Sequence, residues 1–212
     1  MRTILLTIAM LLVAYFVGSI PSGFLVIKAL TGKDIRHYGS GNIGMANAYR
    51  VGGAIPALLV LLGDALKGAI PVLVARWALG LPDLAVVLVG LVAIVGHDFP
   101  VYLRGHGGKG VATSIGVITA LVWPVGVLAM AIWVVVIGIW RFSSLASLLM
   151  LAAAAVFMFA YEWLTDDHHP LFVVFVVALL VVALIQHRTN IDRLLHGREL
   201  KITDPVKPEK PA

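Results

Sequence analysis

Two glycine-rich segments of the sequence each have a cation nearby and could hold a phosphate group. Residues 39–44 read Gly-Ser-Gly-Asn-Ile-Gly, and residues 105–110 read Gly-His-Gly-Gly-Lys-Gly. Glycine N–H groups can turn inward around an anion, and a helix N-terminus that follows adds positive potential. Flexible turns between helices are the alternative interpretation. Because glycine follows Lys109, the second segment is not a Walker A loop, so ATP chemistry is not indicated. We predict phosphate binding by Gly39, Ser40, Gly41, Asn42, Arg50, Gly107, Gly108 and Lys109.

Asp64 and Lys67 interrupt an apolar segment at positions i and i+3, which places them on one face of a helix. Charges at membrane depth are costly and usually face a cavity or another helix. The pair is therefore expected either to contribute to the wall of a site or, as a neutralised pair, to fix helix packing. His97, beside Asp98, is expected either to line a site or to be structural.

His187 ends the last apolar segment and is followed by two polar candidates, Asn190 and Asp192. His187 and Asp192 have the spacing of a His–Asp acyltransferase dyad. On a continuous helix, however, five residues rotate by about 500°, which leaves the two side chains about 140° apart. A dyad would need the helix to end between them, whereas His187 and Asn190 share a face at i and i+3. No set of His, Asp and Glu has metal-ligand spacing, so we predict no metal and no cofactor.

The composition is that of a membrane protein. Of the 212 residues, 60% are hydrophobic and 13% are charged, with a formal net charge of +5, whereas a soluble domain has about 25% charged residues. This excludes a soluble enzyme, a disordered chain and a nucleic-acid-binding domain. The sequence has no cysteine, which excludes disulfides, thiolate metal sites and a cysteine acyl-enzyme.

Apolar runs predict the membrane spans, because a span needs about 20 predominantly apolar residues. Such runs cover residues 3–27, 51–79, 84–101, 111–140, 142–163 and 170–187. One helix over residues 111–140 would be about 45 Å long against a hydrocarbon core of about 30 Å. Trp123-Pro124 offers a break near its middle, and a split there gives seven helices. The fourth helix is then short unless it starts near Lys109.

The distribution of lysine and arginine sets the expected orientation, because short cytoplasmic loops collect these residues. Seven helices with the N-terminus outside place most of the sixteen Lys and Arg on the cytoplasmic side, together with both glycine-rich segments. Six helices would put the basic C-terminal residues on the opposite face. We therefore predict an all-α polytopic membrane protein with seven transmembrane helices and a cytoplasmic C-terminus. Residues 1–200 form a single integral-membrane domain, and the polar, Pro-rich tail 201–212 is expected to be disordered.

Several motifs in order resemble the acylphosphate:glycerol-3-phosphate acyltransferases of bacteria, the PlsY family, over nearly the whole chain. The motifs that carry the resemblance lie at residues 18–23, 39–44, 63–68, 96–97, 107–113, 144–147 and 187–194. The family commonly has Gly-Ala-Thr-Asn where this chain has Gly44-Met45-Ala46-Asn47, so the threonine hydroxyl is missing here.

The resemblance implies an enzyme of the bacterial cytoplasmic (inner) membrane, with seven transmembrane helices and a cytoplasmic active site. It implies transfer of a fatty acyl group from acyl phosphate to glycerol 3-phosphate, which gives lysophosphatidate and phosphate in phospholipid biosynthesis. Neither acyl-CoA nor acyl carrier protein is then the donor, and a soluble PlsX-type phosphate acyltransferase supplies the acyl phosphate. Residue by residue, the family's phosphate-binding and active-site positions match Ser40, Asn42, Arg50, Lys109, His187 and Asn190. We therefore expect catalytic roles for His187, Ser40, Asn190 and Lys109. We further predict supporting roles for Asn47, Asp64, Lys67, His97 and Ser144.

An acyl phosphate is a mixed anhydride with a good leaving group, so no covalent enzyme intermediate is chemically required. We expect direct attack by the glycerol 1-hydroxyl, with the proton passing to the donor's phosphate or to His187. Acylation of Ser40 is the competing mechanism. Two other functions remain as alternatives: a membrane transporter of an anionic or organophosphate solute, and an acyltransferase that uses acyl-CoA or acyl carrier protein.

Overall fold

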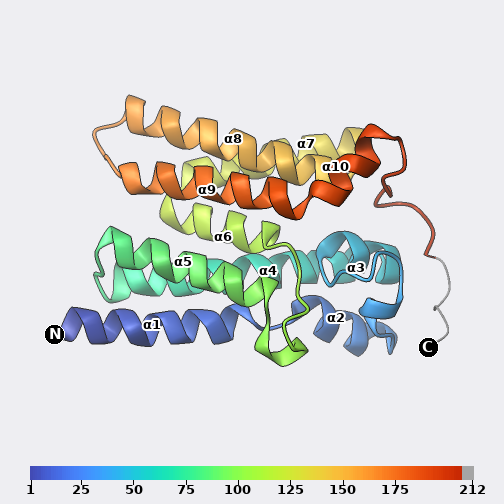
Figure 1. The fold of residues 1–212 in the computed structure, drawn as a ribbon, viewed down its shortest axis with the longest axis horizontal. Helices are drawn as coiled ribbons and strands as arrows, with labels where there is room; N and C mark the ends of the chain where they lie inside the picture. The colour runs from blue at the N-terminus through green and yellow to red at the C-terminus, as the bar shows by residue number, and fades with distance from the viewer. Residues whose placement is uncertain (207–212) are drawn as a thin grey trace.

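The computed structural model describes residues 1–206, and in this part of the chain every regular element is a helix (Figure 1). The predicted all-α class is therefore confirmed. The elements are α1 (Arg2–Gly18), α2 (Ser22–Thr31), η1 (Ile35–His37), α3 (Met45–Gly52), α4 (Ala54–Leu73), η2 (Val74–Ala78), α5 (Asp83–Asp98), η3 (Val101–Leu103), α6 (Val111–Leu121), α7 (Trp123–Trp140), α8 (Ser143–Leu164), α9 (Pro170–Gln186) and α10 (Arg188–Leu195).

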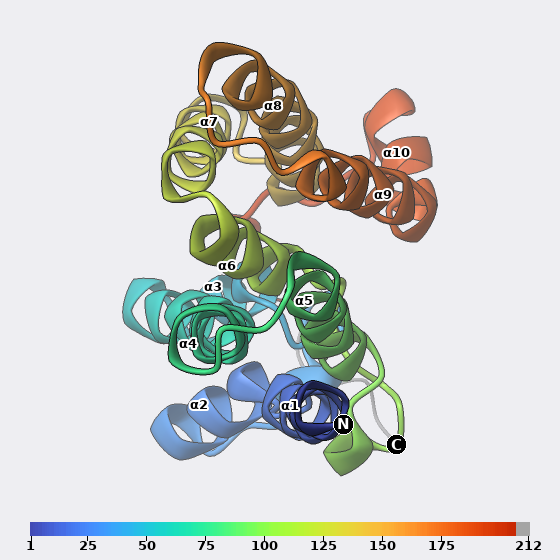
Figure 2. The same cartoon turned by 90° about the vertical axis from the view of Figure 1, so that its left-hand side faces the viewer.

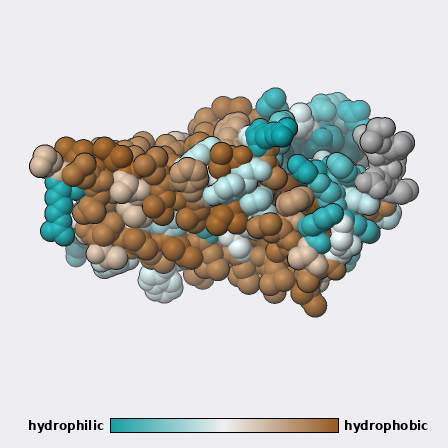
Figure 3. Space-filling view, turned by 90° about the horizontal axis from the view of Figure 1, so that it is seen from below, coloured by the Kyte–Doolittle hydropathy of each residue, from teal (hydrophilic) through white to brown (hydrophobic). Residues whose placement is uncertain are grey.

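The long helices lie roughly along one axis and alternate in direction (Figure 1). We call the end that carries α2, α3 and α10 the polar end, because hydrophilic residues gather there in the surface view (Figure 3). The turns that precede α5 and α9 lie at the opposite end, the far end. Viewed along the helices, α6 separates a layer with α1, α4 and α5 from a layer with α7, α8 and α9 (Figure 2).

Within residues 1–206, five helical segments are long and apolar enough to cross a membrane, and a sixth is obtained if α9 and α10, bent by 63°, count as one span. The remaining predicted span is α6, whose 11 residues are about 16 Å long and too short for a hydrocarbon core of about 30 Å. Figure 1 shows why it is short: α6 begins inside the molecule, level with the end of α5, and not at the polar end. Its N-terminus can therefore carry Lys109 inward.

Proline and glycine set the boundaries of the helices. The predicted break at Trp123-Pro124 is confirmed, since α6 ends at Leu121 and α7 begins at Trp123. The span expected over residues 3–27 lies within one candidate span, Arg2–Thr31, in which the helix is interrupted between α1 and α2 at Pro21, which has no N–H to continue the ladder. The span expected over residues 51–79 begins later than predicted, because Gly53 adopts φ +84° between α3 and α4.

Glycines let the helices around α6 pack backbone against backbone. A Cβ on Gly116 would lie 2.0 Å from the carbonyl oxygen of Ala65, and one on Gly68 would lie 2.4 Å from the carbonyl oxygen of Thr113. Small residues at helix contacts allow this close approach in membranes. The α4–α6 pair is thus a tight unit that fixes the start of α6.

The predicted tail lies partly within the described residues. The Ile202 N–H donates to the Arg141 carbonyl oxygen at 2.8 Å, and the Lys201 N–H donates to the Asp204 carboxylate at 2.8 Å. Residues 207–212 lie outside the described residues, so the expected disorder there stays a prediction.

Candidate active site

A cavity of about 340 Å³ opens towards the polar end between α3, α4 and α6 on one side and α7, α8 and α10 on the other. Ten of the residues singled out in the sequence line it: Ser40, Asn42, Asn47, Arg50, Asp64, His97, Lys109, Ser144, His187 and Asn190. Five others do not line it: Gly39, Gly41, Lys67, Gly107 and Gly108. The structure thus brings together both glycine-rich segments and the end of α9.

The first glycine-rich segment is organised by Asn47, which is 1% exposed. Its side-chain amide donates to the carbonyl oxygens of Ile35, Tyr38 and Asn42 at 2.9–3.2 Å, and its Oδ1 accepts the Ser40 N–H at 3.1 Å. Gly39 is needed beside it, because its φ is +59° and a Cβ there would lie 2.3 Å from Asn47 Oδ1. Asn47 therefore supports the loop that presents Ser40 and Asn42.

The second glycine-rich segment rests on His97, which is buried at the end of α5. A Cβ on Gly108 would lie 2.1 Å from His97 Nε2, and one on Gly107 would lie 2.1 Å from the His97 carbonyl oxygen. That carbonyl oxygen also accepts the Gly108 N–H at 3.2 Å. In this structure Gly107 and Gly108 allow close packing, and the Gly108 N–H is used within the protein.

Lys109 follows these glycines at the start of α6 and donates from Nζ to Asn190 Oδ1. Burial lowers the pKa of the Lys109 ammonium from its ordinary value, and the positive charges of Arg193 and Arg188 lower it further, against the opposing effect of Glu199. The N-terminal turn of α6, with Val111 and Ala112, also lines the cavity. A half-buried cation and a helix N-terminus thus converge where an anion would be stabilised.

His187 lies at the bend between α9 and α10 and is 4% exposed. Its Nδ1 lies 2.9 Å from the Ala183 carbonyl oxygen, so Nδ1 carries a proton and Nε2 of the neutral ring can accept one. Asn190 lines the same cavity, as the shared helix face predicts. Asp192 instead pairs with His196 at 3.2 Å and Arg198 at 3.5 Å, so it forms no dyad with His187.

Glu199 is a cavity residue that the sequence reasoning missed. Its carboxylate accepts hydrogen bonds from Ser144 at 2.7 Å, Asn190 at 2.6 Å and Arg193 at 2.7 Å. Burial opposes ionisation, but these three donors hold the pKa of Glu199 below its ordinary value. Arg193, also missed, lines the cavity as well. The sequence signal for Glu199 was only that it is an acidic residue among the basic residues near the C-terminus, and this signal is too weak to identify a site residue.

Arg50, a predicted phosphate ligand, is bonded to the C-terminal segment. Its guanidinium donates to the carbonyl oxygens of Leu200 at 3.1 Å and Lys201 at 3.0 Å. Burial lowers the pKa of Arg50, with Glu199 acting in the opposite direction. Arg50 therefore lines the cavity as a cation held by neutral carbonyl groups.

Asp64 and Lys67 form an ion pair of 2.7 Å with side chains 2% and 4% exposed. Lys67 also donates to the Ile20 carbonyl oxygen at 2.8 Å, at the break between α1 and α2. Asp64 faces the cavity and lies 3.6 Å from His97 Nδ1. The two interpretations of this pair are thus combined: Lys67 fixes packing behind the wall, and Asp64 is part of the wall.

An apolar groove of about 350 Å³ adjoins the cavity between α4, α6 and α7. Ile115 and Met130 line both spaces. The groove continues along α4 and α6 away from the polar end, past Ala69, Thr119 and Gly126. Its lining is nearly all aliphatic, so it suits an alkyl chain.

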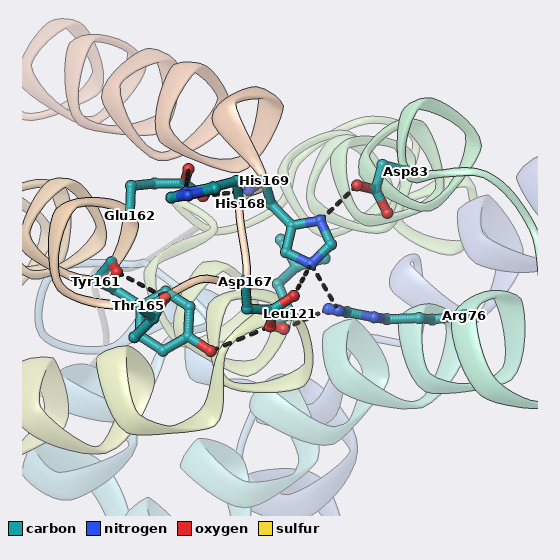
Figure 4. A network of polar contacts seen from close by, with 9 residues as sticks. All are labelled: Arg76, Asp83, Leu121, Tyr161, Glu162, Thr165, Asp167, His168 and His169. Carbon is teal, nitrogen blue, oxygen red and sulfur yellow. Dashed lines mark hydrogen bonds and ion pairs between the residues drawn. The ribbon is translucent and has the colours of Figure 1, made fainter.

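A second polar cluster lies at the far end and involves none of these residues (Figure 4). His169 contacts Asp83 at 2.6 Å and Asp167 at 3.0 Å, and it stacks on Phe172 with ring centroids 4.6 Å apart. The Arg76 guanidinium lies 3.4 Å from Nε2 of His169. These contacts join the turns before α5 and α9.

The chain is similar to known proteins over most of its length. The model of the family described as glycerol-3-phosphate acyltransferase matches residues 8–197. A protein of that name from Jannaschia sp. is 43% identical over 191 residues, which are 90% of this chain and 90% of the relative. A protein of the same name from Coxiella burnetii is 42% identical over 192 residues, 91% of this chain and 96% of the relative.

Two crystal structures of PlsY, described as an integral membrane glycerol 3-phosphate acyltransferase, have the same fold. The glycerol 3-phosphate form superposes with a TM-score of 0.83 at 34% identity and covers 92% of this chain and 94% of that chain. The lysophosphatidic acid form has a TM-score of 0.82 at 32% identity, with the same coverage.

Proposed function

Because this chain belongs to the membrane glycerol-3-phosphate acyltransferases of the PlsY type, we propose that its acyl donor is an acyl phosphate. The fatty acyl group passes to the 1-hydroxyl of glycerol 3-phosphate, and the products are lysophosphatidate and phosphate. One observation carries the proposal: Lys109, His187 and Asn190 meet in a cavity that adjoins an apolar groove. Family membership favours this function over a transporter.

The cation-rich cavity supports binding of two phosphate groups. Lys109, Arg50 and Arg193 all line it, and Glu199 is the anionic lining residue that acts on both Lys109 and Arg50. We assign the substrate phosphates to these side chains and to the N-terminus of α6, with Ser40 and Asn42 at the rim. Glycine amides of the two glycine-rich segments stay predicted contacts, apart from those that already donate within the protein.

The groove supports a donor with a long alkyl chain. With the acyl carbonyl in the cavity, the chain passes between Ile115 and Met130 and continues along α6. Burying each methylene contributes about 0.8 kcal/mol. A phosphate leaving group fits the cavity beside the cations, whereas the groove itself does not discriminate acyl phosphate from a thioester donor.

The proposed reaction is a direct attack. The glycerol 1-hydroxyl oxygen forms a bond to the acyl carbon, and the bond from that carbon to the phosphate oxygen then breaks. The hydroxyl proton passes to the departing phosphate or to Nε2 of His187, which is free because Nδ1 faces the Ala183 carbonyl oxygen. Lys109 and Arg50 stabilise the developing negative charge, usually the largest catalytic contribution.

The surroundings of Ser40 support a mechanism without an acyl-enzyme. Its hydroxyl oxygen accepts the Asn42 N–H at 3.4 Å, and within residues 1–206 no basic side chain is hydrogen-bonded to it. A serine nucleophile needs an adjacent general base. Mass spectrometry after incubation with donor alone should therefore show unmodified protein, and an acyl adduct on Ser40 would contradict this mechanism.

The proposed setting follows from the distribution of charge. We propose that the polar end faces the cytoplasm of a bacterium, with seven helical segments in the inner membrane and α6 as a partial one. A soluble PlsX-type phosphate acyltransferase would then deliver acyl phosphate to the same side.

The test is acyl transfer by the purified protein in detergent or lipid. Glycerol 3-phosphate is the acceptor, and palmitoyl phosphate, palmitoyl-CoA and palmitoyl acyl carrier protein are offered separately. We expect lysophosphatidate from palmitoyl phosphate alone. Product from a thioester alone would retain the reaction but overturn the proposed donor, and product from none in folded protein would favour the transporter.

A further inference from the structure

Asp98, the last residue of α5, lies behind the cavity wall between the elements that carry Lys109 and His187. It does not line the cavity, and the mechanism above does not use it. Its side chain nevertheless contacts the chain next to both of these residues.

The first contact joins α5 to the end of α9. Gln186 Nε2 donates to Asp98 Oδ2 at 2.6 Å across 88 residues of sequence. Gln186 is the last residue of α9, so this bond holds the point at which the 63° bend begins and His187 follows. The ring and the N–H of His187 both bond back along α9, to the Ala183 carbonyl oxygen, and its carbonyl oxygen accepts the Ile191 N–H within α10.

The second contact joins α5 to the start of α6. A Cβ on Gly110 would lie 2.9 Å from Asp98 Oδ1, and one on Gly107 would lie 2.5 Å from the Asp98 carbonyl oxygen. These two glycines flank Lys109 closely, and Gly110 adopts φ +65° as the N-cap of α6. The segment that carries Lys109 therefore packs closely against Asp98.

The side chain is poorly explained as a stabilising group. Asp98 Oδ1 and Gln186 Oε1 are buried and have no hydrogen-bond partner among the described residues. Unsatisfied buried polar atoms are costly and rare, and they call for a specific explanation. A bond that leaves two such atoms is better explained by the geometry that it imposes.

We propose that Asp98 is a positioning residue that sets the distance between Lys109 and His187 by bonding Gln186 and packing against Gly110 at the end of α5. The inference rests on the proposed function, because it treats these two side chains as parts of one catalytic site. Holding two groups in a reactive arrangement is a large source of rate enhancement, and a misplacement of about 1 Å costs up to about 100-fold.

The test compares Asp98→Ala, Asp98→Asn, Gln186→Ala and the Asp98→Ala/Gln186→Ala double variant in the transfer assay. We expect Asp98→Ala and Gln186→Ala each to lower kcat by about 10- to 100-fold, with smaller changes in KM. Asp98→Asn keeps an oxygen that accepts from Gln186, so it should stay within about threefold of wild type. The double variant should have the same kcat as Asp98→Ala, because Asp98 acts through its bond to Gln186.

A structural role would instead lower the unfolding midpoint and leave kcat per folded molecule unchanged. His169→Asn is the matched control, since it removes partly buried polar contacts at the far end and should lower the midpoint without changing kcat. The inference is overturned if Asp98→Ala keeps kcat within about threefold of wild type, if the two single effects multiply, or if His169→Asn loses as much kcat.

Assays of the wild-type protein distinguish failure of this inference from failure of the proposed function. If palmitoyl phosphate is not a donor, the variants are compared with the donor that supports turnover. If no donor supports turnover, the proposed function fails, and positioning is measured by the rise in unfolding midpoint that glycerol 3-phosphate produces. Asp98→Ala should then reduce this rise and Asp98→Asn should keep it, whereas an equal rise in all variants would overturn the inference.

Discussion

Two lysines near the cavity should respond in opposite ways to the same substitution with methionine. Lys67 is almost fully buried and bonds Asp64 at 2.7 Å and the Ile20 carbonyl oxygen at 2.8 Å. Lys67→Met leaves the Asp64 carboxylate with only His97 nearby, at 3.6 Å. Breaking a buried ion pair costs about 3–5 kcal/mol, and about 2–4 °C of unfolding midpoint is lost per kcal/mol at this size. We therefore expect the midpoint to fall by about 6–20 °C.

Lys109 should show the reverse behaviour. Its described bond is to the neutral Asn190, and a hydrogen bond of this kind contributes about 0.5–3 kcal/mol. Burial and the neighbouring Arg193 disfavour its charge, as the lowered pKa indicates. Removing the charge thus offsets the loss of the bond, and Lys109→Met should keep the midpoint within about 4 °C. Its kcat/KM should fall by about 100- to 1,000-fold, as for the loss of one donor to a developing anion.

The assay measures both quantities on the same preparations. Thermal unfolding in detergent gives the midpoint, and lysophosphatidate formation well below every midpoint gives kcat/KM. Lys67→Met should lower kcat/KM per folded molecule by less than about tenfold, because Lys67 lies behind the cavity wall. The reasoning is refuted if Lys109→Met keeps kcat/KM within about threefold, or if it loses as many degrees as Lys67→Met.

Three further outcomes follow from the same geometry. The alkaline limb of kcat/KM should lie below the range of an ordinary lysine, because burial and the neighbouring arginines lower the pKa of Lys109, and Arg188→Gln should move that limb upward. Ala69→Phe, at the end of the groove remote from the cavity, should lower kcat/KM for palmitoyl phosphate by about tenfold and spare a short-chain acyl phosphate. Gly108→Ala should reduce kcat/KM by about 10- to 100-fold through the clash with His97, and an unaffected variant would show that the second glycine-rich segment yields freely.

Much of the fold could be predicted because lipid imposes a simple rule on the sequence. Each apolar run must be a helix when no water is present to satisfy the backbone. The break at Trp123-Pro124 was visible because one helix over residues 111–140 would be too long for the membrane. The start of α6 inside the molecule could not be predicted. Its position depends on contact between Gly116 and Ala65, which are far apart in sequence.

The site could be predicted only as far as its parts carry local signals. The glycine-rich segments and His187 have such signals, and the orientation rule placed them on one side. The N–H group of Gly108 was expected to face a phosphate, but it bonds the His97 carbonyl oxygen, a partner that no spacing reveals. Glu199 escaped notice because its bond to Ser144 spans 55 residues and has no periodic pattern.

The balance of charge in this cavity favours an anionic ligand. The charged residues that line it, apart from the two histidines, are Arg50, Asp64, Lys109, Arg193 and Glu199. Asp64 is already neutralised by Lys67 from behind the wall, so among the lining residues one anion, Glu199, is left with three cations. The protein holds the surplus cations with neutral carbonyl and amide oxygens, which hydrogen-bond them without cancelling their charge. On the proposed function, a substrate phosphate would supply the missing negative charge, and the arrangement that is costly in the empty protein would become favourable when the substrate binds.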